Sequence, residues 1–136
     1  MEIFGLTHPI PEKFANRIYE DKKTVFVGKS FLNKVKIGDK FVIYESHGKK
    51  AYTGWANIKL ITQMQPSEII KKYGDKLIIN EKEFREYSKN RNKLTIIEFE
   101  SFQKFKNIVI PKRWVSLSGK YIYKDEFEFI LNNKDK

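Results

Sequence analysis

The spacing of apolar residues along the chain predicts strands interrupted by short helices. Runs rich in β-branched and aromatic residues predict strands, whereas apolar residues three or four positions apart predict helices. We expect strands over residues 2–6, 24–28, 41–45, 51–61, 94–102 and 107–110, and helices over residues 11–20, 65–74, 80–87 and 124–131. The sheet therefore resumes after two central helices, and the chain closes with a fourth helical pattern.

One predicted hairpin places a tryptophan in an unusual setting. Residues 44–58 read YESHGKKAYTGWANI, so a Gly-Lys-Lys tip separates two apolar runs. Side chains alternate between the two faces of a strand, which places Trp55 opposite Gly54, Ala56 and Ile58. Because the small and aliphatic face is the expected core face, we expect Trp55 to point away from that core. Its ring would then either wall a binding surface or lie beneath a helix.

Length and charge set the class of protein. The 136 residues fit one domain, here residues 1–131, with residues 132–136 expected to form a frayed polar tail. Lys and Arg number 27 against 17 acidic residues, and this net charge of +10 favours nucleic acid as the partner. Residues 22–72 hold eleven lysines and three acids, so eleven minus three places +8 there. The basic residues are thus concentrated in one part of the chain.

Several classes of protein and of site are disfavoured by the residues present. The chain has no cysteine, which excludes disulfides and thiolate chemistry and fits a cytoplasmic location. The N-terminal residues lack a signal-peptide pattern and no apolar run could cross a bilayer, so we expect no membrane association. His8 and His47 have no ligand-type partner at helical spacing, and the glycines form no phosphate-binding motif. We expect no metal and no cofactor.

Catalytic patterns are equally sparse. None of the serines lies in a G-x-S-x-G motif, and neither histidine has an evident orienting acid. Glu98 and Glu100 share a strand face and form the one candidate carboxylate pair, although two acids on the solvent side of a strand are usually surface charge. The sequence therefore predicts no catalytic residues.

Basic and aromatic residues are interleaved at several points. Lysines neutralise phosphates and exposed rings stack on bases, so this mixture is typical of nucleic-acid binding. The Lys49-Lys50 tip would contact phosphates, and Trp55 is the favoured stacking ring. Trp114 follows Arg113 in a basic turn and could serve either as a platform or as core packing.

Three segments carry a resemblance to a known superfamily. The stretches DKKTVFVGK (21–29), KIGDKFVIYES (36–46) and YTGWANIKLI (52–61), following a β-α opening, resemble the PUA-like superfamily, its ASCH branch and a related archaeal family of unknown function. The resemblance implies an α+β fold, a mixed β pseudo-barrel of about five to six strands flanked by helices. It also implies a cleft between barrel and helices that receives RNA, a modified base or a nucleoside.

The resemblance also bears on the chemistry of that cleft. ASCH proteins carry the motif G-x-K-[TS]-x-[ET]-x-R, which Lys23 and Thr24 match and from which Asp21, Phe26 and Gly28 depart. Members that hydrolyse acylated nucleosides have a threonine nucleophile where Phe26 stands, and a phenyl ring cannot attack a carbonyl. The sequence thus favours a module that binds RNA or a modified nucleotide without catalysis.

Two other interpretations remain open. One is a small nucleoside amidohydrolase or ribonuclease that uses Lys23 with Thr24 or Glu68, and the other is a protein-interaction module. For the binding module, we expect Lys23, Thr24 and Phe26 to border one concavity. The full set of residues expected to bind nucleic acid is Lys22, Lys23, Thr24, Phe26, Lys29, Lys49, Lys50, Trp55, Arg113 and Trp114.

Overall fold

The computed structural model describes residues 2–136 and contains one six-stranded sheet. Its strands are β1 (Ile3–Ile10), β2 (Val25–Gly28), β3 (Lys40–Glu45), β4 (Ala51–Met64), β5 (Leu94–Val109) and β6 (Lys120–Tyr123). Its helices are α1 (Glu12–Tyr19), α2 (Pro66–Tyr73), the single 3₁₀ turn η1 (Gly74–Lys76), α3 (Glu81–Tyr87) and α4 (Lys124–Asn133). The α+β fold expected from the sequence is confirmed.

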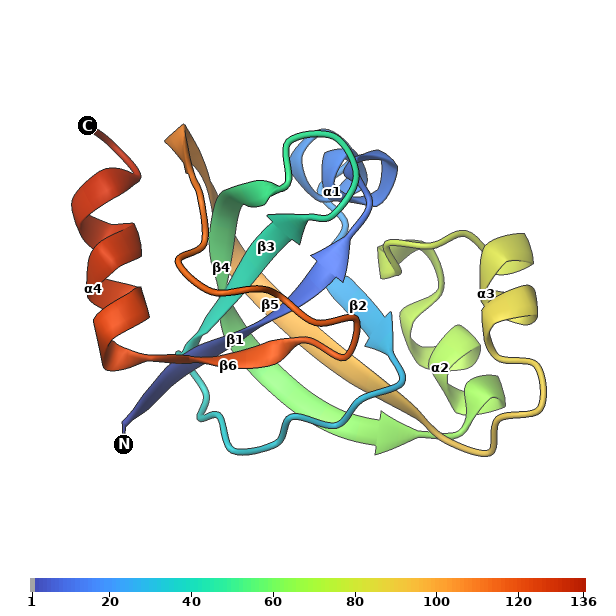
Figure 1. The fold of residues 1–136 in the computed structure, drawn as a ribbon. Helices are drawn as coiled ribbons and strands as arrows, with labels where there is room; N and C mark the ends of the chain where they lie inside the picture. The colour runs from blue at the N-terminus through green and yellow to red at the C-terminus, as the bar shows by residue number, and fades with distance from the viewer. Residues whose placement is uncertain (1) are drawn as a thin grey trace.

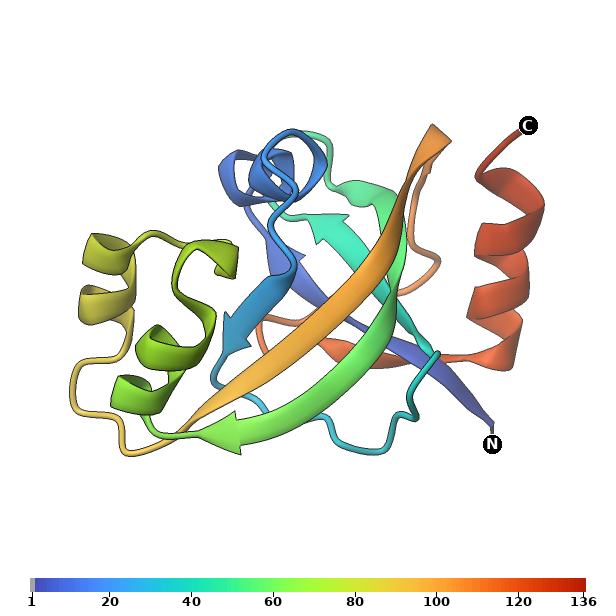
Figure 2. The same cartoon turned by 180° about the vertical axis from the view of Figure 1, so that it is seen from behind.

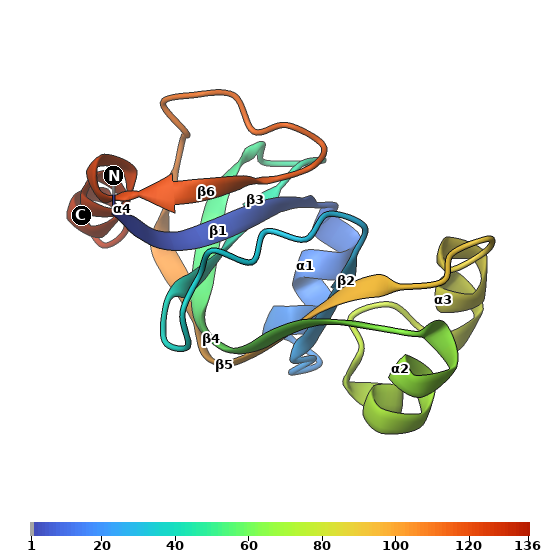
Figure 3. The ribbon, with the colours of Figure 1, turned by 90° about the horizontal axis from the view of Figure 1, so that it is seen from below.

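The sheet is mixed and strongly curled. Its strand order is β2-β5-β4-β3-β1-β6, in which β1 and β3 are parallel and every other neighbouring pair is antiparallel. The long strands β4 and β5 run across the whole molecule (Figure 2). Seen from below, β1 and β6 lie on one side of the curl and β4 and β5 on the other (Figure 3). The two edge strands are β2 and β6, so the barrel stays open between them.

The helices cover opposite sides of this sheet. The α2 and α3 helices stand at one side and α4 at the other, with α1 at one end of the sheet (Figure 1). The α3 helix begins with a capping box: the Asn80 side chain accepts from the Glu83 N–H at 2.8 Å, and the Glu83 carboxylate accepts from the Asn80 N–H at 2.7 Å. This reciprocal pair satisfies two of the free N–H groups at the helix start.

Three apolar clusters support these layers. The central cluster lies inside the curl and includes Leu6, Phe41 and Phe99. A second cluster joins α2 and α3 to β2 and β5, and a third lies between the outer face of the sheet and α4. Tyr19 of α1 packs closely over Gly54 of β4. Any side chain at position 54 would collide with the Tyr19 hydroxyl, so glycine allows α1 to pack against the central cluster. That hydroxyl lies 2.7 Å from Thr53 Oγ1.

Trp55 belongs to the third cluster, and the expectation that it is an exposed stacking ring is wrong. Its side chain is 4% exposed, its ring stacks on Phe127 of α4 at 5.4 Å, and it meets Phe105 edge-on at 5.3 Å. Its Nε1 donates to Gln103 at 3.2 Å. Strand alternation predicted correctly that Trp55 lies apart from the central core. The docking of α4, which alternation does not reveal, covers the ring.

Other differences concern strand limits and the end of the chain. The strand β6 was not predicted, β1 continues through Pro9 to Ile10, and β5 is continuous where two strands were expected. Within β5, Ser101 has a φ of +55°, in the left-handed region, which marks an irregularity in a long strand. The segment 132–136 is not simply frayed. Lys134 is buried, and its carbonyl accepts from the Asn107 N–H at 2.8 Å.

Candidate nucleic-acid interface

An aromatic cleft lies where the barrel fails to close. It has a volume of about 390 Å³ and is bounded by the β1–α1 junction, by β2, by the segment through α3 and by the connection between β5 and β6. This volume lies within the range of small-molecule sites in proteins. The side chains that shape it are His8, Phe14, Phe26, Ile79, Tyr87 and Leu117.

Two stacked rings form the floor of the cleft. His8 of β1 and Phe26 of β2 stack with centroids 4.8 Å apart and planes 24° apart, although their strands are not neighbours in the sheet. Phe26 also packs on Phe41 of the central core at 5.4 Å. Phe26 is therefore a ring fixed by the core.

His8 carries the unusual polar group of the cleft. Its side chain is 4% exposed, and its Nε2 has no hydrogen-bond partner among residues 2–136. Burial lowers the pKa of His8 from 6.5 to about 4, so the imidazole is neutral at pH 7. A buried polar atom without a partner costs free energy, and such atoms are concentrated at functional sites. A neutral imidazole nitrogen can hydrogen-bond to the edge of a planar ligand.

A cation lies at the edge of the cleft. Lys29, which follows β2, places its Nζ 4.6 Å from the centroid of the Tyr87 ring of α3. Both residues line the cleft and Lys29 is exposed. A ligand that inserted a flat ring would therefore meet a positive charge, suited to phosphate, beside an aromatic wall.

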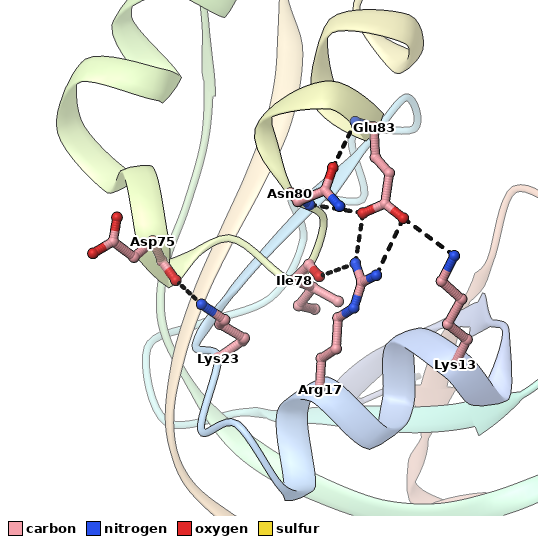
Figure 4. Close-up of polar contacts among 7 residues, drawn as sticks. All are labelled: Lys13, Arg17, Lys23, Asp75, Ile78, Asn80 and Glu83. Atoms are coloured by element: carbon pink, nitrogen blue, oxygen red, sulfur yellow. Dashed lines mark hydrogen bonds and ion pairs between the residues drawn. The ribbon is translucent and has the colours of Figure 1, made fainter.

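An ion-pair network fixes α3 against α1. Arg17 of α1 forms a two-pronged pair with Glu83 of α3, at 2.5 and 3.2 Å, and also donates to the Ile78 carbonyl at 3.0 Å (Figure 4). Lys13 lies 3.4 Å from the same carboxylate. The hydrogen bond from Arg17 is the main reason that the pKa of Glu83 falls from 4.5 to about 2. Because Glu83 and Ile78 line the cleft, this network holds its wall in place.

Lys23 and Phe26 do not border one concavity, so that expectation is wrong. Lys23 lines a separate hollow of about 430 Å³ between α1, η1 and α3, and its Nζ donates to the Asp75 carbonyl (Figure 4). Ile78 and Ile79 line both hollows and form the wall between them. Thr24 instead links two distant segments through its own backbone. Its N–H donates to the Lys76 carbonyl at 3.1 Å, and its carbonyl accepts from the Phe99 N–H at 3.0 Å.

The other predicted lysines lie on two surfaces. Lys22 places its Nζ 4.8 Å from the Phe102 ring of β5 and donates to the Tyr19 carbonyl at 3.2 Å. Lys49 and Lys50 are exposed at the hairpin tip between β3 and β4. At this tip Gly48 packs beside Glu12, in the first turn of α1. The tip therefore lies next to the helix whose Pro11 and Phe14 line the cleft.

Arg113 and Trp114 border a third hollow, of about 360 Å³, together with Tyr121 and Tyr123 of β6. Trp114 is 84% exposed, so of the two tryptophans it is the one available for stacking. Among the ten predicted residues, the structure thus brings Phe26 and Lys29 into the cleft and Arg113 and Trp114 into this third hollow. The remaining six lie elsewhere, with Trp55 inside the fold.

Sequence reasoning missed most of the cleft walls. His8 was weighed only as a metal ligand and as a catalytic residue, and Phe14 and Tyr87 fell within predicted helices without any role in a site. The local signal was present only for His8, because a histidine inside an apolar strand segment calls for a partner. The walls come from four separate parts of the chain, and no local pattern shows that they meet.

Comparison with known proteins places the chain in a family. Residues 3–124 match the family described as Domain of unknown function (DUF365). The chain belongs to this family. An uncharacterized protein of Methanocaldococcus jannaschii is 30% identical to it over 104 residues, which are 68% of this chain and 96% of that protein. The resemblance to an archaeal family of unknown function is thereby confirmed.

Solved structures show that the DUF365 chain has the ASCH, PUA-like fold. ASCH from Zymomonas mobilis matches with a TM-score of 0.86 and 18% identity, covering 96% of both chains. A hypothetical protein from Leishmania major matches with a TM-score of 0.54 and 13% identity, covering 96% of this chain and 94% of that one. At these identities the likeness concerns the fold alone.

Two further surveys concern the described part of the DUF365 protein. Among the helices of residues 2–136, none combines the length and apolarity that a membrane crossing requires. The same residues contain no group of three or more His, Asp and Glu side chains arranged to hold a metal ion.

Proposed function

We propose that this protein binds RNA or a modified nucleotide by receiving one nucleobase in the aromatic cleft, without catalysing a reaction. The observation that carries the proposal is the unpartnered Nε2 of His8 in a cleft lined by aromatic rings. A flat heterocycle suits such a site, because its faces pack on rings while its edge offers hydrogen-bond groups. His8 would contact that edge, and Lys29 would contact the attached phosphate.

Charge and fold support the same conclusion. The net charge of +10 attracts polyanions, and the exposed Lys49-Lys50 tip lies beside the helix that borders the cleft. The ASCH fold belongs to a superfamily that includes RNA-binding members, which agrees with this assignment. Phe26 replaces the hydroxyl nucleophile of hydrolytic relatives, which is why binding is preferred over hydrolysis.

The direct test is a calorimetric titration of the full chain with each ribonucleoside monophosphate in turn. We expect saturable binding that Tyr87→Ala weakens by about 1–3 kcal/mol, the range for loss of one stacking ring. Lys29→Ala should weaken binding less, because an exposed lysine contributes to affinity mainly by contacting the phosphate of the ligand. Lys93→Ala, which removes an exposed lysine away from the cleft, is the matched control and should bind as the parent does.

Two outcomes would contradict the proposal. If Tyr87→Ala and Lys29→Ala bound mononucleotides as tightly as the parent, the cleft would not be the site. If the parent instead released products from RNA or from acylated nucleosides, and Tyr87→Ala stopped that release, the hydrolase interpretation would replace binding alone.

A further inference from the structure

The connection between β5 and β6, residues 110–119, exposes large apolar side chains. Trp114 is 84% exposed and Leu117 91%, and Ile110 is also exposed. Clustered exposure of this kind on one segment marks an interaction surface more often than chance. The proposed nucleobase site uses only Leu117 from this connection. The purpose of Trp114 and its surroundings is therefore open.

Trp114 borders a hollow that is built like a stacking site. Tyr121 and Tyr123 project from alternate positions of β6, and their rings lie 6.5 Å apart in an edge-on arrangement. The Tyr121 hydroxyl accepts a hydrogen bond from the Lys34 N–H at 3.1 Å, which fixes that ring. Three aromatic side chains thus surround a hollow of about 360 Å³.

The charge of the hollow suits phosphate. Glu126, one of its two acids, is neutralised by Lys120 at 3.1 Å and accepts from the Tyr52 hydroxyl at 2.6 Å. Lys112 and Arg113 take part in no ion pair among residues 2–136. The Lys112 Nζ lies 4.4 Å from the centroid of the Phe129 ring, so Arg113 is the cation of this pair with neither an ion pair nor a ring contact among residues 2–136. Cations beside exposed rings form the combination that binds single-stranded nucleic acid.

The hollow and the nucleobase cleft are joined by one connection, residues 110–119. Leu117 lines the cleft and Trp114 lines the hollow, so their Cα atoms, three residues apart, lie within about 11 Å of each other. A tight turn follows Trp114: Ser116 Oγ donates to Gly119 O at 2.9 Å, and Gly119 N donates to Ser116 O at 3.0 Å. Gly119 has a φ of +79°, which suits glycine. The two sites are therefore joined by a short segment of chain.

We infer that the hollow at Trp114 is a second subsite that receives a neighbouring nucleotide of the strand whose base occupies the cleft. The preferred ligand is then a single-stranded RNA segment and not a free nucleotide. This inference rests on the proposed function, because it requires a base in the cleft. A membrane or a protein partner would use the same apolar side chains, but neither accounts for the continuity with the cleft.

The test compares two ligands on the full chain: a ribonucleoside monophosphate and a single-stranded oligoribonucleotide of about six residues, within the site sizes known for such binders. We expect Trp114→Ala to weaken oligonucleotide binding by about 5- to 150-fold and to leave mononucleotide binding unchanged. Ile37→Ala, which removes another exposed apolar side chain, is the matched control and should change neither. Trp114 also provides a direct signal, because a stacked base should quench its fluorescence while Trp55 stays buried.

The outcomes separate this inference from the proposed function. Oligonucleotide binding that is insensitive to Trp114→Ala, with mononucleotide binding intact, overturns the second subsite alone. Absence of binding to either ligand overturns both. If Trp114→Ala changed only the binding of anionic vesicles or the self-association of the protein, the connection would serve a membrane or a second copy of the chain, and the inference would be wrong.

Discussion

At the scale of single residues, the burial of His8 carries a cost in stability. Its ring is enclosed by the fold, stacked on Phe26, and left without a hydrogen-bond partner for Nε2 among residues 2–136. The native state therefore holds the imidazole neutral over a pH range in which an unfolded histidine would gain a proton. A ligand that engaged Nε2 would recover part of the free energy that this burial costs.

This arrangement predicts a specific dependence of stability on pH. The native pKa of about 4 lies below the unfolded value of 6.5, so only the unfolded state binds the proton as pH falls through this interval. His8 should therefore lower the free energy of unfolding by up to about 1.4 kcal/mol per pH unit between pH 6.5 and 4. Denaturant unfolding of the parent and of His8→Gln at several pH values measures this dependence. The free energy of unfolding of the variant should lack the fall that His8 causes between pH 6.5 and 4.

The exposed His47 provides the control for this experiment. His47→Gln should retain the parent's pH dependence, because His47 lies at an exposed hairpin tip. Identical pH profiles for the parent and His8→Gln would show that His8 is not held neutral.

At the scale of elements, the position of α3 depends on its contact with α1. The Arg17–Glu83 pair spans 66 residues of sequence and is only partly exposed. Glu83 has a second role, because its carboxylate also completes the capping box with Asn80. A change to glutamine separates these roles, since glutamine can still accept the hydrogen bond of the capping box.

We expect Glu83→Gln to lower the free energy of unfolding by about 1–2 kcal/mol near pH 7, because it removes a charge-assisted pair that is largely shielded from solvent. The pKa of Glu83 is lowered to about 2, so its stabilising effect is complete above pH 4.5 and disappears as pH falls toward 2. The difference between variant and parent should shrink over this interval. Glu81→Gln, which removes an exposed pair with Arg85, should cost less than about 0.5 kcal/mol. A larger loss for Glu81→Gln than for Glu83→Gln would contradict this ranking.

Elements with strong local signals could be predicted from the sequence, and elements defined by distant contacts could not. The α3 helix has a local signal in the sequence, because Asn80 can cap it and Glu83 follows three residues later. The hairpin of β3 and β4 has one in its glycine-containing tip. The four-residue strand β6 has no such signal, and it forms because β1 offers it a pairing edge. The burial of Trp55 has the same origin, because α4 covers it from more than seventy residues further along the chain. Most of the cleft walls escaped prediction for this reason too, because four distant segments build them.

At the scale of the whole molecule, the basic charge is the property that the sequence shows most directly. The excess of lysine within residues 22–72 does not form one patch at the cleft, because Lys22 and Lys23 are held elsewhere by Phe102 and Asp75. Within this excess, Lys29 lines the cleft itself, and the hairpin tip with Lys49 and Lys50 lies beside the first turn of α1. Phosphate contacts of this kind affect affinity without selecting sequence.

The corresponding prediction concerns salt. Replacing both Lys49 and Lys50 with alanine should reduce the slope of log affinity against log salt by about 1.4, since each contact with a single strand contributes about 0.7. All oligonucleotide sequences should be weakened alike. Titrations of a single-stranded RNA at several salt concentrations measure the slope, and a double variant with the parent's slope would remove the tip from the interface.

The pairing of β1 with β6 has a consequence for how the protein is made. Ile3 pairs with Tyr123, so this part of the sheet joins residues 120 positions apart. During synthesis, β1 and β3 can pair early, but the outer edge of β1 stays open until residues 120–123 have left the ribosome. An open edge can pair with another nascent chain. The connection 110–119, which borders both proposed nucleotide sites, is thus the last one translated before the sheet is complete, and neither proposed site can form before it.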